Sequence, residues 1–159
     1  PLVDHSYKHD SGKVSVDFEV PAGTTSTRLE YRVTGHGGVA SPEDKACIGG
    51  AEEFCQRLHH IYIDDQEIDT PAPWRKDCAD LCTLKKTANG QEYCAENPCG
   101  AISSVRASRA NWCPGSLTPP LTFDKATKLA PGKHTFAYQI DSVKEGGSWR
   151  VSAVLYAYK

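Results

Sequence analysis

Short runs in which apolar and polar residues alternate are the feature that most limits how this chain folds. The clearest run spans residues 13–20, with apolar side chains at even positions and polar ones at odd positions. Residues 28–34 alternate again, and the long run at 148–158 carries apolar side chains on both faces. Successive side chains of a strand point to opposite faces, so this period is typical of strands. No stretch carries a sustained apolar stripe at helical spacing, and we expect an all-β chain.

Turn-forming residues divide the rest of the chain into short segments. Further expected strands lie at residues 61–63, 67–69, 101–106, 121–123 and 134–140, with a tight turn at 64–66 and a hairpin turn at 145–147. Residues 1–12 are expected to be an extended lead-in, residues 35–50 mostly a loop, and residues 52–60 at most two helical turns. The spacing predicts an all-β sandwich of about seven to nine strands with one cysteine-rich insertion. Its last strand is expected to be central.

The cysteines are concentrated in the middle of the chain. There are seven, and their irregular gaps lack the paired spacing of a zinc site. We expect disulfides, and therefore an oxidising compartment, with one thiol free or paired with another molecule. The candidates are Cys47, Cys55, Cys78, Cys82, Cys94, Cys99 and Cys113. Residues 70–100 hold four of them, show no period, and form a predicted cysteine-rich insertion.

The charge of the chain and its first residues limit the kinds of partner and the cellular location that we expect. The formal net charge is −2, and basic residues never run beyond adjacent pairs, which argues against nucleic acid and anionic membranes as partners. No apolar run approaches the roughly 20 residues that cross a bilayer. The chain begins at Pro1 and contains no methionine. We therefore expect that an initiator and a signal peptide have been removed, which indicates a secreted, extracellular or periplasmic protein.

Residues 109–115 concentrate several kinds of chemistry in one short stretch. Arg109 brings a planar charged fork of donors, Trp112 a large apolar ring with one N–H, and Cys113 a potential cross-link. Pro114 and Gly115 then turn the chain. Such a stretch is either a cross-linked corner of the core or one wall of a ligand site.

This heptad closely resembles a signature in the second domain of the peptide:N-glycosidase F family. Residues 53–63 are similar to that family's Glu-Trp-Cys-x-Arg-x-His segment, and residues 31–38 resemble the strand that enters its Gly-Trp-Gly-His turn. A Phe-x-Tyr strand and a Val-Ser-Ala strand near the end are also similar. The resemblance runs in consistent order from about residue 12 to the last residue.

The resemblance implies a fold, an activity and residue roles. The expected fold is a single jelly-roll domain over residues 1–159, an antiparallel β-sandwich of about eight strands. That family cleaves the amide bond between asparagine and the first N-acetylglucosamine of an N-linked glycan, in a groove between two jelly rolls. By family pattern, Glu53 corresponds to the active-site glutamate of the second domain and Arg109 to an arginine that contacts substrate. Cys78 and Cys113 correspond to a cystine pair. Cys55 belongs to another, in which Cys47 is the candidate partner because Ala51 stands at the usual position.

Several departures from the family pattern bear on activity. The principal catalytic aspartate lies in a first jelly roll that these residues do not include. His36 stands where the family's turn has tryptophan, Ser108 replaces an acidic residue, and the segment with Cys82, Cys94 and Cys99 has no counterpart. The related copper-dependent peptidylglycine monooxygenases bind metal through His-x-His and methionine. Neither feature occurs here, so we expect no copper and no other cofactor.

Two functions from different classes follow. The favoured one is a secreted binding or structural module that engages a glycan, a glycoprotein, a second jelly-roll chain or copies of itself through His36, Glu53, Arg109 and Trp112. The alternative is an amidase that acts with a first jelly roll, in which Glu53 is catalytic. Glu52 and Glu53 are neighbours and should face different sides, so they do not form an acid/base pair.

For the other candidates, the structural roles compete with the functional ones. Arg109 either contacts a ligand or forms an ion pair, with Asp77 or Asp80 as expected partners. Trp112 is expected in the core more than in a ligand site, although both remain open. Of the adjacent His59 and His60, at most one should face the core.

Overall fold

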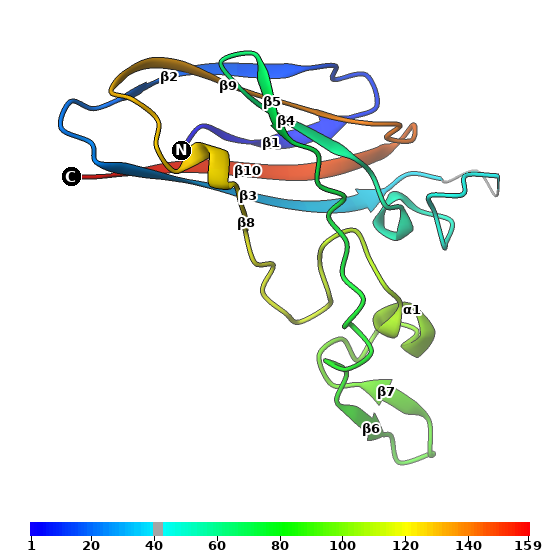
Figure 1. Cartoon of the computed structure of the whole chain (residues 1–159). Coiled ribbons are helices and arrows are strands. Elements are labelled where there is room, and N and C mark those ends of the chain that lie inside the picture. The colour runs from blue at the N-terminus through cyan, green and yellow to red at the C-terminus, as the bar shows by residue number, and fades with distance from the viewer. Residues whose placement is uncertain (40–42) are drawn as a thin grey trace.

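The computed structural model describes residues 1–39 and 43–159. Within these residues, two four-stranded antiparallel sheets pack face to face (Figure 1). The first has the order β1 (Val3–Lys8), β10 (Gly147–Tyr158), β3 (Ser26–Gly37) and β8 (Leu121–Thr122). The second has the order β2 (Val14–Val20), β9 (Gly132–Ile140), β4 (His59–Ile63) and β5 (Gln66–Asp69). The all-β antiparallel sandwich predicted from the sequence is confirmed.

The core lies between the two sheets and follows the alternation seen in the sequence. On β10, Trp149, Val151 and Ala153 face inward and are fully buried. Phe136 and Tyr138 of β9 meet them from the other sheet. Each large side chain removed from water in this way stabilises the fold by about 1.5–3 kcal/mol. As predicted, β10 is central, because it pairs with β1 on one edge and β3 on the other.

Two expectations about strands and turns were wrong. The lead-in at residues 1–12 contains β1, which pairs with β10 from Val3 to Lys8, and its Val3 and Tyr7 enter the core. The turn at residues 145–147 does not join a hairpin. It carries the chain from β9 in one sheet to β10 in the other, so the two strands it links are not paired. Part of the predicted loop at residues 35–50, namely residues 40–42, lies outside the described residues.

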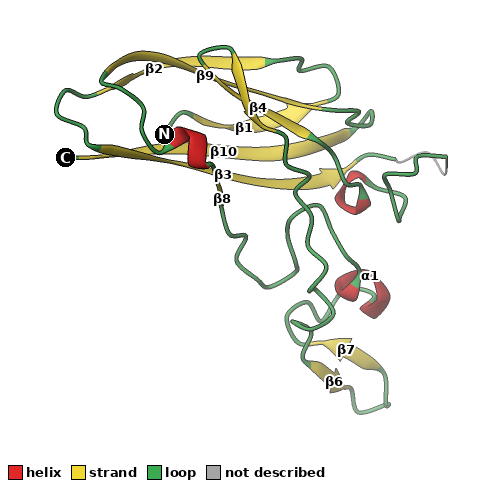
Figure 2. Cartoon of the chain, viewed as in Figure 1, coloured by secondary structure: helices red, strands yellow, loops and turns green. Residues whose placement is uncertain are grey.

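The helical pieces are short and lie outside the sheets (Figure 2). They are η1 (Glu52–Phe54), α1 (Ile102–Arg106) and η2 (Asp124–Ala126). The predicted strand at residues 101–106 was wrong, because this segment forms α1, in which the Val105 N–H donates to the Ala101 carbonyl at 2.9 Å. Among the described residues, no helix has the length and apolar character needed to span a membrane.

A cysteine-rich segment projects from the sandwich (Figure 1). It holds the hairpin of β6 (Leu84–Lys86) and β7 (Glu92–Cys94), and α1 follows it. We call residues 79–106 the insertion lobe. One disulfide, Cys82–Cys94, cross-links the hairpin within the lobe, and another, Cys78–Cys113, joins the two chain segments at its base. That residues 1–159 form a single domain stays a prediction.

Candidate functional site

A disulfide-closed turn at one end of the sandwich positions the candidate carboxylates. Cys47 and Cys55 are bonded, and the Ile48 N–H donates to the Phe54 carbonyl at 2.9 Å. The resemblance had implied this pairing. The enclosed η1 is a single 3₁₀ turn, in which Glu52 and Glu53 point to different sides as predicted.

Glu52 faces the interior, where its carboxylate accepts four hydrogen bonds. Its carboxylate accepts hydrogen bonds from Arg57 Nε at 2.7 Å and Nη2 at 3.0 Å. It also accepts from Trp149 Nε1 at 2.9 Å and from the Lys144 N–H at 3.2 Å. The side chain is fully buried. Glu52 is therefore a structural group that ties η1 to β10, and sequence analysis assigned it no such role.

Asp44 completes this buried charge arrangement. Its carboxylate lies 3.0 Å from Arg57 Nη1 and 3.0 Å from Lys144 Nζ. Partial burial by itself would raise the pKa of Asp44, but hydrogen bonds from Lys144 and Arg57 outweigh it and lower the pKa to about 2. The loop that precedes η1 is thus held to the sandwich by charge as well as by its disulfide.

Glu53 and Arg109 meet at the opposite side of η1. Glu53 Oε2 lies 3.0 Å from Arg109 Nη1. The backbone N–H of the following residue, Ala110, donates to the Glu53 carbonyl at 2.8 Å. The predicted ion-pair partners of Arg109 were wrong, because Asp77 pairs with Arg75 instead. The side chain of Glu53 is 25% exposed, whereas that of Arg109 is 4% exposed. The carboxylate is therefore the part of this pair that solvent and ligands can reach.

Arg109 is enclosed by aromatic rings and by the insertion lobe. Its guanidinium carbon lies 4.8 Å from the Phe54 ring centroid and 4.6 Å from that of Trp112. Its Nη2 donates to the carbonyl and, at 2.9 Å, to the hydroxyl of Ser104 in α1. Its Nε is buried and has no hydrogen-bond partner among the described residues. Arg109 thus joins the sandwich to the lobe and fixes the Glu53 carboxylate through their ion pair.

His36 and Trp112 form the aromatic side of the same cluster. Their ring centroids are 5.1 Å apart, and Trp112 Nε1 donates to the Gly35 carbonyl at 3.0 Å. Both side chains are half-buried. Partial burial lowers the pKa of His36, with the Glu53 carboxylate opposing and the Arg109 guanidinium reinforcing the shift. The imidazole is therefore neutral at neutral pH. Trp112 is half-buried and lies outside the sandwich core, so the expectation that favoured the core was wrong.

The backbone of the heptad explains how these groups come together. Asn111 adopts a left-handed conformation, with φ of 64°, and its side-chain amide donates to the Val33 carbonyl at 3.0 Å. A Cβ atom on Gly35 would stand 2.7 Å from the Ala110 Cβ, so only glycine allows the heptad to approach β3 this closely. The disulfide Cys78–Cys113 follows the pairing that the resemblance implied. Cys99 is exposed and is the unpaired cysteine.

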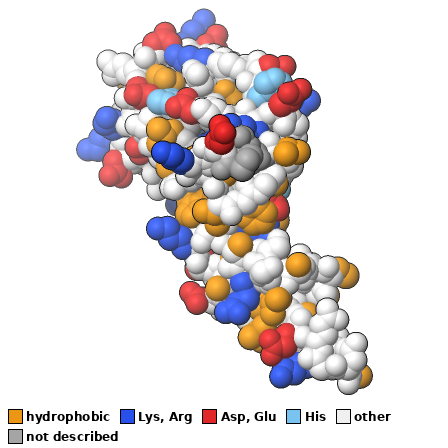
Figure 3. Space-filling model, turned by 90° about the vertical axis from the view of Figure 1, so that its right-hand side faces the viewer, with side chains coloured by type: hydrophobic (Ala, Val, Ile, Leu, Met, Phe, Trp, Pro, Cys, Tyr) orange, Lys and Arg blue, Asp and Glu red, His pale blue; other side chains and the backbone are white. Residues whose placement is uncertain are grey.

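The four predicted site residues therefore lie together as one group. We call Glu53, Arg109, His36 and Trp112 the Glu53 cluster. In the view from the end of the sandwich that carries η1, apolar side chains gather where the sandwich meets the lobe (Figure 3). A half-exposed carboxylate beside aromatic faces suits a ligand with both hydroxyl groups and apolar C–H surfaces. Among the described residues, no group of three or more His, Cys, Asp or Glu side chains suits a metal ion.

Fold and site define an antiparallel β-sandwich module whose one end carries a carboxylate, an arginine and two aromatic rings. A family model described as peptide-N-glycosidase F, C terminal, matches residues 5–156. The chain belongs to this peptide-N-glycosidase F C-terminal family. No curated protein sequence matches the chain.

Solved structures agree with the family assignment. PNGF-II is 29% identical with a TM-score of 0.64 over 92% of this chain and 24% of its own. PNGase F, a glycosylasparaginase from Flavobacterium meningosepticum, is 21% identical with a TM-score of 0.63 over 99% of this chain and 47% of its own. A peptide-N(4)-(N-acetyl-β-D-glucosaminyl) asparagine amidase is 17% identical with a TM-score of 0.59, over 98% and 51%. The last two likenesses concern the fold alone. The chain spans about a quarter to a half of the length of these proteins.

Proposed function

We propose that this chain is a glycan- or glycoprotein-binding module, secreted into an oxidising compartment, and that the Glu53 cluster faces the ligand. One observation carries the proposal: Glu53 is a partly exposed carboxylate, held in place by Arg109 and flanked by half-buried rings. A carboxylate accepts hydrogen bonds from sugar hydroxyls, and an aromatic face packs against the C–H side of a sugar ring. Family membership supports the same class of ligand.

The number of carboxylates available at the Glu53 cluster favours binding over catalysis. Hydrolysis of a glycosylated carboxamide needs a group that activates water and a group that protonates the leaving nitrogen. Glu52 is adjacent in sequence, but both of its oxygens are engaged in the interior by Arg57 and other donors. The Glu53 cluster therefore offers one available carboxylate. A complete amidase would need an acid or base from elsewhere.

The second candidate function is an amidase that acts together with a first jelly-roll domain. Membership of the peptide-N-glycosidase F C-terminal family favours it, and the proteins of similar fold include a glycosylasparaginase and an asparagine amidase. Those proteins are about two to four times longer than this chain by the covered fractions. In this arrangement Glu53 contacts the substrate and the partner domain supplies the missing acid.

Replacing Glu53 tests the binding proposal. We expect Glu53→Gln to weaken binding of N-acetylglucosaminyl-asparagine about tenfold or more, because hydrogen bonds to a charged group are worth about 1.5–3 kcal/mol. Titration calorimetry measures the affinity. The matched control is Glu19→Gln, an exposed glutamate on β2, which should bind as the wild type does.

A second variant protects this test from effects on folding, because Glu53→Gln also removes the counterion of the buried Arg109. His36→Ala removes one aromatic face without changing that ion pair and should also weaken binding. Equal affinities for the wild type and both variants would contradict the proposal. Release of glycan from a denatured glycoprotein by this chain alone would overturn the binding-only function and support the amidase.

A further inference from the structure

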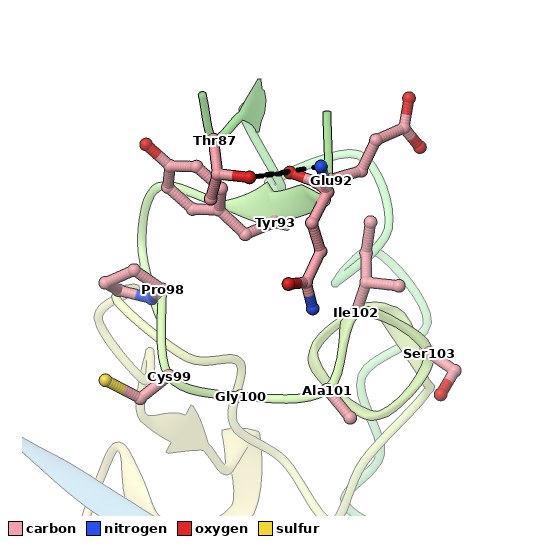
Figure 4. A pocket seen from close by; sticks show the side chains of 10 residues that line it. Thr87, Glu92, Tyr93, Pro98, Cys99, Gly100, Ala101, Ile102 and Ser103 are labelled. Atoms are coloured by element: carbon pink, nitrogen blue, oxygen red, sulfur yellow. Dashed lines mark hydrogen bonds between the residues drawn. The ribbon is translucent and has the colours of Figure 1, made fainter. Parts of the chain in front are cut away.

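A cavity lies in the insertion lobe, and none of its lining residues belongs to the Glu53 cluster. It has a volume of about 540 Å³ and lies between the β6–β7 hairpin and the segment that leads into α1 (Figure 4). Cavities that hold small molecules in proteins typically measure about 300–1,000 Å³. The residues that line it include Thr87, Gln91, Tyr93, Pro98, Ile102 and Ser103. The site described above makes no use of this cavity.

The lining of this cavity suits a neutral ligand that has both apolar and hydroxyl-bearing surfaces. Tyr93 and Pro98 lie on one side of the opening and Ile102 on the other (Figure 4). The side-chain amide of Gln91 adds an uncharged donor and acceptor, whereas the Thr87 hydroxyl is hydrogen-bonded to the Gln91 backbone. A saccharide combines apolar ring faces with a rim of hydroxyl groups, and this mixed wall complements both.

Charged and reactive groups at the cavity are directed elsewhere. Glu92 lines the cavity, but its carboxylate lies 3.5 Å from Lys86 Nζ and points away from the opening (Figure 4). The sulfur of Cys99 also points outward (Figure 4). The cavity therefore offers little to select a charged ligand, and a neutral saccharide is the class that its inward groups favour.

Helix α1 places this cavity next to the Glu53 cluster. Ile102 and Ser103 line the cavity, and the next residue, Ser104, accepts hydrogen bonds from Arg109. Helix α1 and the Arg109 guanidinium therefore lie between the cavity and Glu53, and an α-helix with its side chains is about 10 Å across. One oligosaccharide of a few sugar residues is long enough to contact both.

The cavity wall is held in shape by covalent bonds. Cys82–Cys94 cross-links the hairpin, and Cys94 follows Tyr93 directly in β7. The Thr83 N–H donates to the Glu96 carboxylate at 2.9 Å and holds the two ends of the hairpin together. A wall fixed before binding lowers the entropic cost of taking up a ligand.

We propose that the lobe cavity is a second saccharide subsite, which contacts outer sugars of the neutral N-linked glycan whose inner end meets the Glu53 cluster. This inference rests on the proposed function and deepens it, because the insertion lobe then determines how long a glycan the module binds. The module then prefers an extended glycan over a single sugar. Tyr93 is the residue expected to contribute most, through its aromatic face.

Tyr93→Ala tests the proposal with two probes of different length. The probes are N-acetylglucosaminyl-asparagine and a neutral high-mannose N-glycan attached to asparagine. We expect Tyr93→Ala to weaken the long probe about tenfold and to leave the short probe unchanged, whereas Glu53→Gln weakens both. Tyr156→Ala, at a partly exposed tyrosine on β10, is the matched control and should change neither affinity. Ile102→Ser, from the opposite wall, should act as Tyr93→Ala does.

The possible outcomes distinguish failure of the second subsite from failure of glycan binding at the Glu53 cluster. If the wild type binds the short probe but the Tyr93 and Ile102 variants bind both probes normally, the second subsite is overturned and the Glu53 cluster stands. Equal weakening of both probes would show that the lobe only supports the first site, which also overturns the subsite. If the wild type binds neither probe, both proposals fall.

Discussion

Glu52→Gln is expected to lower the free energy of unfolding by about 3 kcal/mol, the largest effect we expect from any single substitution in η1. The change leaves the Arg57 guanidinium buried beside a neutral amide, and breaking a buried ion pair by removing one partner typically costs about 3–5 kcal/mol. Asp44 still faces Arg57 at 3.0 Å, which places the effect at the lower end. Urea titration measures it, and the thermal midpoint should fall by about 10 °C.

Two further variants separate the ion pair from a general effect of altering a glutamate. Glu19→Gln, at an exposed position, should change the free energy of unfolding by less than about 0.5 kcal/mol. The double variant Glu52→Leu with Arg57→Leu should cost less than the sum of the two single changes, because no charge is left alone in the interior. A Glu52→Gln protein as stable as the Glu19→Gln control would show that this carboxylate does not hold η1 to the sandwich.

Stability is expected to fall steeply between pH 6 and pH 4 because of His59. Burial lowers the pKa of His59 to about 3, and the neighbouring His60 adds to this shift. Its Nδ1 is hydrogen-bonded to the Tyr31 hydroxyl at 2.9 Å, and its ring lies 4.5 Å from Trp149. The folded protein therefore keeps this imidazole neutral under conditions in which the unfolded chain binds a proton. Stability is lost as pH falls below the unfolded value of 6.5, by about 1.4 kcal/mol per pH unit.

Among the other shifted groups, His36 adds to the loss of stability just below pH 6.5, because burial lowers its pKa too, by less than that of His59. The pKa of His60 is raised by its hydrogen bonds with Asp141 and Glu67, so its contribution is complete below the unfolded pKa and is lost only as pH rises. The lowered pKa of Asp44, about 2, contributes stability that is lost below about pH 4.

Urea midpoints measured from pH 7 to pH 4 check the prediction for His59. His59→Gln should flatten the slope between pH 6 and pH 4, because the titrating group is gone. His60→Gln is the neighbouring control. It should lower stability below pH 6.5 and leave the slope between pH 6 and pH 4 unchanged. An equal slope in the wild type and in His59→Gln would assign the acid sensitivity to another group.

Alternation predicted the sandwich because it is a direct result of burying one face of a strand. It failed at β1, where His5 and Tyr7 face inward beside only one aliphatic residue, Val3, so no apolar period is visible. It failed at α1 because five residues are too few to show a helical period. A glycine turn such as Gly146–Gly147 also looks the same whether the strands it joins pair or lie in opposite sheets.

The site was predictable to the extent that its residues lie in short, specific motifs. The heptad led to Arg109 and Trp112, and the family pattern led to Glu53. Glu52 was missed because a buried glutamate contradicts the general preference of this residue for solvent. Its partner Trp149 lies 97 positions away, so nothing local indicated the contact. The lobe cavity was missed because its walls come from a hairpin and a helix that have no apolar period.

The short ring closed by Cys47 and Cys55 makes chain length, and not only residue identity, a determinant of what this surface presents. One peptide bond separates the carboxylate that stabilises the interior from the carboxylate that meets solvent. A slip of one residue within the ring would bring either Glu53 and Phe54 or Ala51 and Glu52 to the interior and exposed positions, so one of the two carboxylates would be lost from its place. Insertions and deletions at residues 48–51 should therefore alter both stability and recognition at once, whereas substitutions at residue 53 alter mainly recognition. The length of the ring determines which of the two glutamates is buried and which is exposed.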